Sequence, residues 1–264
     1  MRLPTFFISH GGGPWPWMDS QQHHYAGLRK ALQRMPELIG EQPDAILMIS
    51  AHWEAPEFTL SSAEHPGMIY DYHGFPEETY SISYPAPGAP WLAKQVRALL
   101  NQAGLTAQLD AQRGFDHGMY CPMAVAYPGA DIPVVQLSLK EGLDSREHLA
   151  LGHVLTPLRD QGILIIGSGL SYHNLRHFGP SAHQVSANFD DWVHETLTEE
   201  DAEVRELRLT EWESAPSARQ AHPREEHLLP LMVATGAARQ DKARRVYHQT
   251  DFMGGISVSN FQFG

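Results

Sequence analysis

Histidines follow several of the most apolar segments of this sequence, and their placement is the first sign of chemistry. His10 ends the run "FFISH" and precedes three glycines, and His52 follows the run "AILMISA" directly. His173 comes after a third apolar run, residues 163–167, within "GSGLSYHN". In α/β sheets, ligands bind beyond the carboxyl ends of the strands, where the loops meet. The sequence therefore predicts that these histidines share one site.

Two more histidines stand in contexts that suit such a site. His117 lies in "GFDHG", where Gly114 and Gly118 allow close approach of backbone or ligand. His227 begins a predicted helix in "PREEHLLPL", directly after Glu226. Both also have an ordinary interpretation, because a lone histidine is more often a hydrogen-bonded core or rim residue, and Glu226 could simply complement a helix dipole. From the residues alone, His227 is the weaker of these two candidates.

The remaining histidines lie mainly on polar stretches or on predicted helix surfaces. His73, in "DYHGFP", has no assignment, and His173 itself has a structural alternative as a loop anchor beside Asn174. We expect the others to be solvated: His23, His24, His65, His148, His153, His177, His183, His194, His222 and His248.

The composition favours a small-molecule partner. A formal net charge of −12 over 264 residues argues against binding to a nucleic-acid backbone. The single cysteine, Cys121, cannot form an internal disulfide, so any metal must use histidine and carboxylate ligands. The sequence shows neither a signal-peptide pattern nor an apolar run of the roughly 20 residues that span a bilayer. We expect a cytoplasmic protein with no membrane partner.

Apolar runs alternate with helical patterns, which is typical of an α/β fold. The predicted strands are residues 5–9, 46–50, 80–84, 134–139 and 163–167, several of them apolar throughout, as in strands covered on both faces. The predicted helices are residues 25–35, 91–103, 146–161, with Ser145 as N-cap, and 182–197. We therefore expect a layered α/β fold with a central mostly parallel or mixed sheet flanked by helices.

Two later segments differ in character from the rest. The tail after Arg245 alternates in the period of a half-exposed strand, and we expect it to join the same sheet, in antiparallel orientation. Residues 197–227 are charged enough to form a solvated excursion. Since no linker or repeat divides the chain, residues 1–264 are interpreted as one catalytic domain.

Five motifs in order resemble one enzyme family. "ISHGGGP", "ISAHW", "GFDHG", "GSGLSYHNLR" and "EEHLLPL" spread over nearly the whole chain, with "YPAPGAP" and "IPVVQLSL" in addition. Together they are similar to the class III extradiol ring-cleavage dioxygenases, in the DOPA-dioxygenase-like branch of the LigB superfamily. The resemblance implies that His10, His52 and His227 hold a divalent metal ion. It also implies that His173 is a fourth ligand or lies beside the metal, and that His117 transfers protons as an acid and base.

The implied reaction is the cleavage of a catechol ring with dioxygen. A site with three protein ligands leaves positions open for both substrates, and a neutral histidine can remove and return a proton. His117 and His173 are the candidates for that role. Fe(II) is expected for activity because Zn(II) has no redox chemistry, although Zn(II) is an alternative occupant of the site. Two other functions stay open: a zinc-dependent hydrolase, and a non-catalytic metal-binding or partner-binding member of the superfamily.

The surroundings of the histidines predict the substrate class. Aromatic residues flank the proposed ligands, so we expect a flat pocket for a single-ring catechol, such as one with a DOPA-like side chain. The glycines of "HGGGP" lack the lysine of a phosphate-binding loop, and we interpret them as space for substrate. A homo-oligomer is one option for the assembly. The expected wall residues are Trp15, Trp17, Tyr72, Phe75 and Tyr120, with ordinary packing as the alternative for Trp15 and Trp17.

Overall fold

One mixed sheet organises the computed structural model, which describes residues 2–199 and 201–264. The strand order across the sheet is β4-β3-β5-β2-β6-β1-β8-β7. The strands are β1 (Thr5–Ser9), β2 (Ala45–Ala55), β3 (Phe58–Ser61), β4 (Ala107–Asp110), β5 (Val134–Lys140), β6 (Ile163–Gly169), β7 (Ala243–Phe252) and β8 (Ile256–Phe263).

The middle of the sheet is parallel and its margins are mixed. Strands β5, β2, β6 and β1 run parallel to one another, while β8 pairs antiparallel with β1 and with β7. The expected fold class is therefore confirmed, as is the antiparallel tail. At the opposite edge of the sheet, β3 is antiparallel to β5 and parallel to β4. Strands β3 and β4 were not predicted, because each has only four residues.

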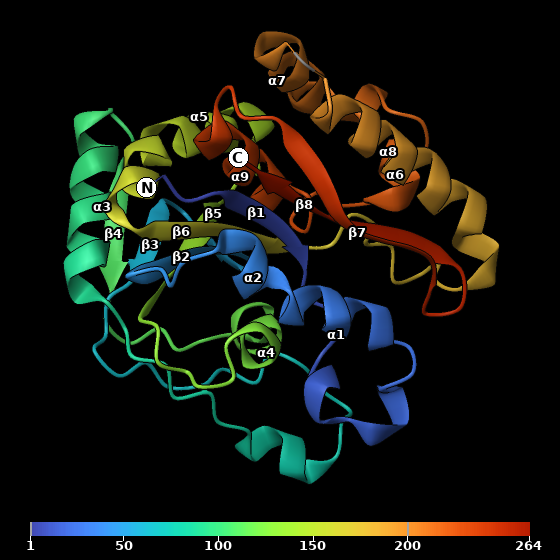
Figure 1. The fold of residues 1–264 in the computed structure, drawn as a ribbon, viewed down its shortest axis with the longest axis horizontal. Coiled ribbons are helices and arrows are strands. Elements are labelled where there is room, and N and C mark those ends of the chain that lie inside the picture. Colours follow the sequence, from blue (N-terminus) through green and yellow to red (C-terminus); the bar gives the residue numbers. More distant parts are fainter. Residues whose placement is uncertain (1, 200) are drawn as a thin grey trace.

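Helices cover both faces of the sheet. Figure 1 shows α1 and α4 on one side, and α5 and α9 on the other, where α9 contacts β6 and β1. All ten residues of α9 are buried between the sheet and α5. The helices are α1 (Ala26–Gln33), α2 (Met35–Ile39), α3 (Pro90–Gln102), α4 (His117–Ala126), α5 (Ser145–Leu155), α6 (His183–Leu197), α7 (Ala202–Thr210), α8 (Ala218–Ala221) and α9 (Leu229–Ala238).

Three predictions about elements are wrong. Residues 80–84 are not a strand: a short 3-10 helix, Glu77–Ser81, ends there. The predicted helix 146–161 is α5 followed by a 3-10 segment, since Pro157 cannot donate a backbone hydrogen bond and interrupts the α-helix. The N-cap of α5 is Asp144 instead of Ser145, and its carboxylate accepts from the backbone N–H groups of Arg146 and Glu147.

The charged segment 197–227 is also not a solvated excursion. Within its described part, α7 and α8 pack against α6, and α7 also contacts α5 and α9. Leu209, Trp212 and Ala221 are buried, and so is Arg205 of α7. The other charged residues of α7, Glu203, Glu206 and Arg208, keep contact with solvent. No helix among residues 2–199 and 201–264 is long and apolar enough to cross a membrane.

Candidate metal centre and substrate cavity

The central strands bring His10 and His52 to the same edge of the sheet. His10 follows β1 directly and donates its backbone N–H to the carbonyl of Gly169, at the end of the neighbouring strand β6. His52 lies inside β2, which continues to Ala55 instead of ending at Ser50. The register of β2 against β5 shifts between Ile49 and Glu54, so a bulge carries His52.

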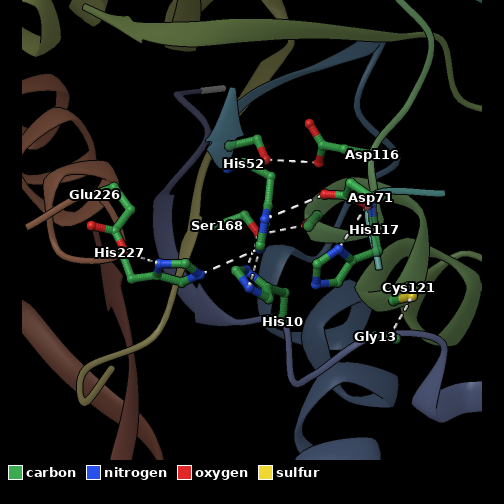
Figure 2. A network of polar contacts seen from close by, with 12 residues as sticks. His10, Gly13, His52, Asp71, Asp116, His117, Cys121, Ser168, Glu226 and His227 are labelled. Atoms are coloured by element: carbon green, nitrogen blue, oxygen red, sulfur yellow. Dashed lines mark hydrogen bonds and ion pairs between the residues drawn. The ribbon is translucent and has the colours of Figure 1, made fainter. Parts of the chain in front are cut away.

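Three imidazole nitrogens meet in the space at this edge. The Nε2 atoms of His52 and His10 are 3.1 Å apart, and those of His227 and His52 are 3.3 Å apart. Figure 2 shows the three rings converging from β1, β2 and the segment before α9. At such distances two nitrogens need a hydrogen or a cation between them, so the protonation of each ring decides what the cluster can bind.

Ser168 determines the tautomer of His10. The Ser168 hydroxyl donates to the carbonyl of Gly118 at 2.5 Å, which uses its only hydrogen. The Nδ1 of His10 lies 3.1 Å from the same oxygen and therefore donates to it. We assign the proton of His10 to Nδ1, which leaves the Nε2 lone pair directed at the other two histidines.

Carboxylates give the same tautomer to the other two rings. The Nδ1 of His227 is 2.9 Å from Glu226 Oε1, and the Nδ1 of His52 is 3.3 Å from Asp71 Oδ2. An ionised carboxylate only accepts hydrogen bonds, so both Nδ1 atoms carry the proton. The Nε2 lone pair of His52 thus lies beside those of His10 and His227, which fits a divalent cation held by three imidazoles with hydrogen-bonded partners behind them.

Burial keeps these histidines neutral. It lowers the pKa of His10 and of His227 well below the usual value, and repulsion from the neighbouring histidines lowers both further. For His52, burial and the charge of His117 lower the pKa to about 3, although Asp71 acts in the opposite direction. A neutral imidazole is the form that binds a metal ion.

Asp71 joins a ligand candidate to a second histidine. Its Oδ1 accepts from the Nδ1 of His117 at 2.8 Å and from the backbone N–H of His117 at 3.1 Å, while Oδ2 faces His52. Burial alone would raise the pKa of Asp71, but the hydrogen bonds from His117 outweigh it and the pKa is lowered. Asp71 is therefore ionised, and His117 presents a free Nε2.

Glu226 makes the matching connection on the other side of the cluster. Its Oε1 lies 3.1 Å from the Nδ1 of His173 as well as 2.9 Å from that of His227. The two rings are stacked, with centroids 3.4 Å apart and planes inclined by 18°. Burial favours the protonated form of Glu226, but its hydrogen bond with His173 outweighs this and lowers the pKa. Asp71 and Glu226 thus each contact one histidine of the inner cluster, which is His10, His52 and His227, and one histidine beside it.

A buried network behind the site fixes the bulge of β2. Asp116 is fully buried and accepts from Ser50 Oγ at 2.8 Å, from Gln136 Nε2 at 2.8 Å and from Arg113 at 3.0 Å. Arg113 also donates to the backbone carbonyl of His52, and Ser50 Oγ accepts the backbone N–H of His52. The three donors compensate the charge of Asp116 in the core. Arg113 and Ser50 also hold the carbonyl and the N–H of His52, so the backbone of His52 is fixed from both sides.

Gly118 explains the glycine after His117. A Cβ on Gly118 would lie 2.7 Å from Ser50 Oγ and 3.0 Å from a ring carbon of His52. The absence of a side chain lets the first turn of α4 approach β2 closely. This contact confirms the close approach expected from "GFDHG", and it brings His117 beside His52, with ring centroids 4.0 Å apart.

All five histidines line one cavity of about 500 Å³. Its volume is in the range of small-molecule sites. Tyr72, Phe75 and Phe178 contribute aromatic surface, and Gly11, Gly12 and Gly13 form part of the wall. The "HGGGP" loop therefore leaves space beside His10, as the sequence predicts.

Three of the five expected wall aromatics do not reach this cavity. Tyr72 and Phe75 do line it, whereas Trp15, Trp17 and Tyr120 are absent from its lining. Trp15 is buried, stacks on Tyr25 and donates its indole N–H to the carbonyl of His10. Trp15 thus supports the loop from behind and does not face the substrate space.

Two histidines expected in solvent are buried. His148 Nδ1 lies 2.7 Å from the carbonyl of Asp144, and His222 Nε2 lies 3.0 Å from the carbonyl of Ser171. Burial lowers the pKa of both, that of His222 to about 4. Polar neighbours in the sequence were a poor guide here, because they belong to the opposite face of the same helix or turn.

Sequence reasoning missed two of the supporting carboxylates, Asp71 and Asp116. Asp71 lies two residues before His73, in a stretch without regular structure, and nothing in the spacing of "DYHGFP" links it to His117. Asp116 directly precedes His117 in "GFDHG", and this position next to a candidate site residue was the available signal. His73 itself is exposed and lies at the wall of the cavity.

Comparisons with known proteins identify the family of this chain. Residues 4–262 match the family model described as the catalytic LigB subunit of aromatic ring-opening dioxygenase. The chain is 39% identical over 264 residues to the 4,5-DOPA dioxygenase extradiol of Beta vulgaris, covering 98% of this chain and 96% of that protein. It is 32% identical to the protein of the same name from Escherichia coli K12, over all of this chain and 95% of the relative.

A solved structure has the same fold. The crystal structure of an uncharacterized protein from Escherichia coli K12 superimposes with a TM-score of 0.79 at 29% identity, covering both chains completely. The match to the family model extends over nearly the whole chain and includes all six histidines that line the cavity. The chain therefore belongs to the LigB family of metal-dependent aromatic ring-opening dioxygenases, and its activity is extradiol ring cleavage.

Proposed function

We propose that the chain cleaves a single-ring catechol with dioxygen at a divalent metal ion held by His10, His52 and His227. The observation that carries this proposal is the convergence of three Nε2 lone pairs whose Nδ1 atoms are all hydrogen-bonded. These three histidines would hold Fe(II), which would supply the redox chemistry needed for electrons to pass from the catechol ring to dioxygen. Zn(II) lacks this redox chemistry, so iron is the metal we propose for activity.

His117 is the proposed acid and base. Its Nδ1–H is bound to Asp71, so its Nε2 is free to take a proton from a catechol hydroxyl. The charge that His117 gains would be stabilised by the ionised carboxylate of Asp71. The ring of Tyr72 meets His117 edge to face, with centroids 5.9 Å apart, and limits its movement.

His173 is proposed as a second proton carrier instead of a fourth ligand. The ring of His173 is stacked on that of His227, with centroids 3.4 Å apart and planes inclined by 18°. It therefore lies beside this ligand candidate and not among the three Nε2 atoms that would hold the ion. Its hydrogen bond with Glu226 leaves Nε2 of His173 free on the cavity side.

The relatives support a DOPA-like substrate. Several curated relatives are named 4,5-DOPA dioxygenase extradiol, and the aromatic lining of Tyr72, Phe75 and Phe178 suits a flat ring. Family membership also favours ring cleavage over the zinc hydrolase and over a purely binding role.

Oxygen consumption tests this function. The protein is loaded with Fe(II) without oxygen, mixed with a panel of catechols, and then exposed to air in an oxygen electrode cell. We expect oxygen uptake with a yellow ring-fission product, and neither with the zinc-loaded control. No uptake by the iron-loaded protein with any catechol of the panel would overturn the proposal.

A further inference from the structure

Tyr25 holds a hydroxyl group in the wall of the cavity. It immediately precedes α1 and is buried, with 2% of its surface exposed. Its ring stacks on Trp15 with centroids 4.6 Å apart, and it meets Phe252 edge to face at 5.3 Å. Contacts on two sides fix the ring, so the position of the hydroxyl is set before any ligand arrives.

The hydrogen bonding of this hydroxyl is incomplete. Its oxygen accepts the backbone N–H of Gly12 at 3.1 Å, but no acceptor among the described residues takes its proton. Burial raises the pKa of Tyr25 to about 12, so the proton stays in place at neutral pH. By contrast, the hydroxyl of Tyr72 in the same cavity donates to the carbonyl of Thr79 at 2.7 Å. A buried donor without an acceptor is uncommon in native proteins.

The glycine loop places this donor next to His10. A Cβ on Gly11 would lie 2.4 Å from Trp15 and 2.9 Å from the Tyr25 ring, and its φ of +80° also favours glycine. The loop therefore lies directly on the aromatic pair. Tyr25 thus belongs to the same wall of the cavity as His10 and the Gly11–Gly13 segment, and its hydroxyl lies beside Gly12.

Few other groups of this cavity can hold a polar substituent. Among the residues that the structure describes, no lysine or arginine lines it, and the single carboxylate, Asp71, accepts hydrogen bonds from two histidines. Gln21, four residues before Tyr25, is the only amide side chain in the described part of the wall. A substituent on the ring would therefore be recognised by hydrogen bonds, with Tyr25 as the donor whose position is fixed.

We propose that the Tyr25 hydroxyl forms a substrate-recognition subsite, in which it donates a hydrogen bond to an oxygen acceptor on the side chain of the catechol. The inference rests on the proposed function of the cavity. It predicts that catechols with a carboxylate or carbonyl on the side chain are preferred over those with a hydrocarbon side chain. A carboxylate gains more than a neutral carbonyl, because hydrogen bonds to charged groups are stronger.

Three matched catechols test this subsite: dihydrocaffeic acid, its methyl ester, and 4-propylcatechol. Dissociation constants are measured by calorimetry without oxygen on the zinc-loaded protein, for the wild type and for Tyr25→Phe. We expect the variant to bind the acid on the order of tenfold more weakly and the ester a few-fold more weakly. Its affinity for 4-propylcatechol should be unchanged. With the iron-loaded enzyme, the same substrate-dependent loss should appear in KM and leave kcat largely intact.

Tyr72→Phe is the matched control, since it removes a hydroxyl from the same cavity that is already bonded to the protein. Its affinity ratio between acid and 4-propylcatechol should equal that of the wild type. An equal loss for all three ligands in Tyr25→Phe, or no loss for any of them, would refute the subsite. If the wild-type protein bound none of the catechols and consumed no oxygen with them, the proposed function would fail, and the subsite with it.

Discussion

Asp71→Asn tests the connection between the ligand histidines and the proton-transferring histidine. The substitution keeps the size of the side chain but replaces one acceptor oxygen by an NH₂ donor. Asp71 now accepts from three donors: two on His117, at 2.8 and 3.1 Å, and one on His52, at 3.3 Å. We expect the remaining oxygen of the amide to stay with His117, where two donors are closer. The NH₂ group then faces the Nδ1 of His52.

A donor opposite that Nδ1 favours the wrong tautomer of His52. The imidazole would move its proton to Nε2 and lose the lone pair that the cluster directs at the metal. Removing a partner behind a ligand histidine typically lowers metal affinity by about 10- to 100-fold, or roughly 1.4 to 3 kcal/mol. His117 keeps its acceptor, so turnover of the fully loaded variant should fall much less than that of His117→Ala.

Competition with a chelator measures the affinity. Zn(II) is titrated into wild type, Asp71→Asn and the control Asp160→Asn, whose side chain is exposed. We expect a 10- to 100-fold higher dissociation constant for Asp71→Asn alone, with far-UV circular dichroism unchanged. An unchanged metal affinity together with a large loss of turnover would refute this reasoning, because Asp71 would then act through His117 only.

The other predictions concern the ligands, the proton and pH. His10→Ala or His52→Ala should abolish metal binding while the fold survives. Normal metal content in both variants would show that these histidines do not hold the ion. His117→Ala should keep its metal and lose roughly 10²- to 10⁴-fold in turnover, whereas His227→Ala should lose the metal; elemental analysis and single-turnover rates would expose exchanged roles. Burial lowers the pKa of His52 to about 3 and of His222 to about 4, so the unfolded chain binds more protons below pH ~6.5. The metal-free protein should therefore become less stable to urea as pH falls from 7 to 5, and an unchanged midpoint would contradict the burial of these rings.

The strands that carry the site could be predicted because their composition is unambiguous. The bounds of β1 agree with the prediction, and β5 and β6 extend only slightly beyond it. Central parallel strands are apolar throughout, so periodicity and burial give the same answer. The position of His10 at the end of β1 could be predicted for this reason. His52 lies at the same edge of the sheet, as expected, although the bulge that carries it has no signature in the sequence.

Contacts between distant segments could not be predicted from the sequence. Asp71 lies in an irregular stretch and meets His117, which is 46 residues away, only through the tertiary fold. His227 became a strong candidate through the family resemblance alone, since its own segment reads as an ordinary helix start. The prediction of the aromatic wall was partly wrong. The sequence does not distinguish an indole that donates to a backbone carbonyl, as Trp15 does, from one that faces a ligand.

The separation of the three inner histidines along the chain has a consequence for folding. The contacts between their rings span 42 residues from His10 to His52 and 175 from His52 to His227. Such a site cannot exist in the unfolded chain, so an ion that binds it stabilises only the folded state, by an amount that grows with the free ion concentration. The resistance of this protein to heat and proteolysis in the cell is then set partly by metal supply, and a shortage of the ion would lower its abundance as well as its activity.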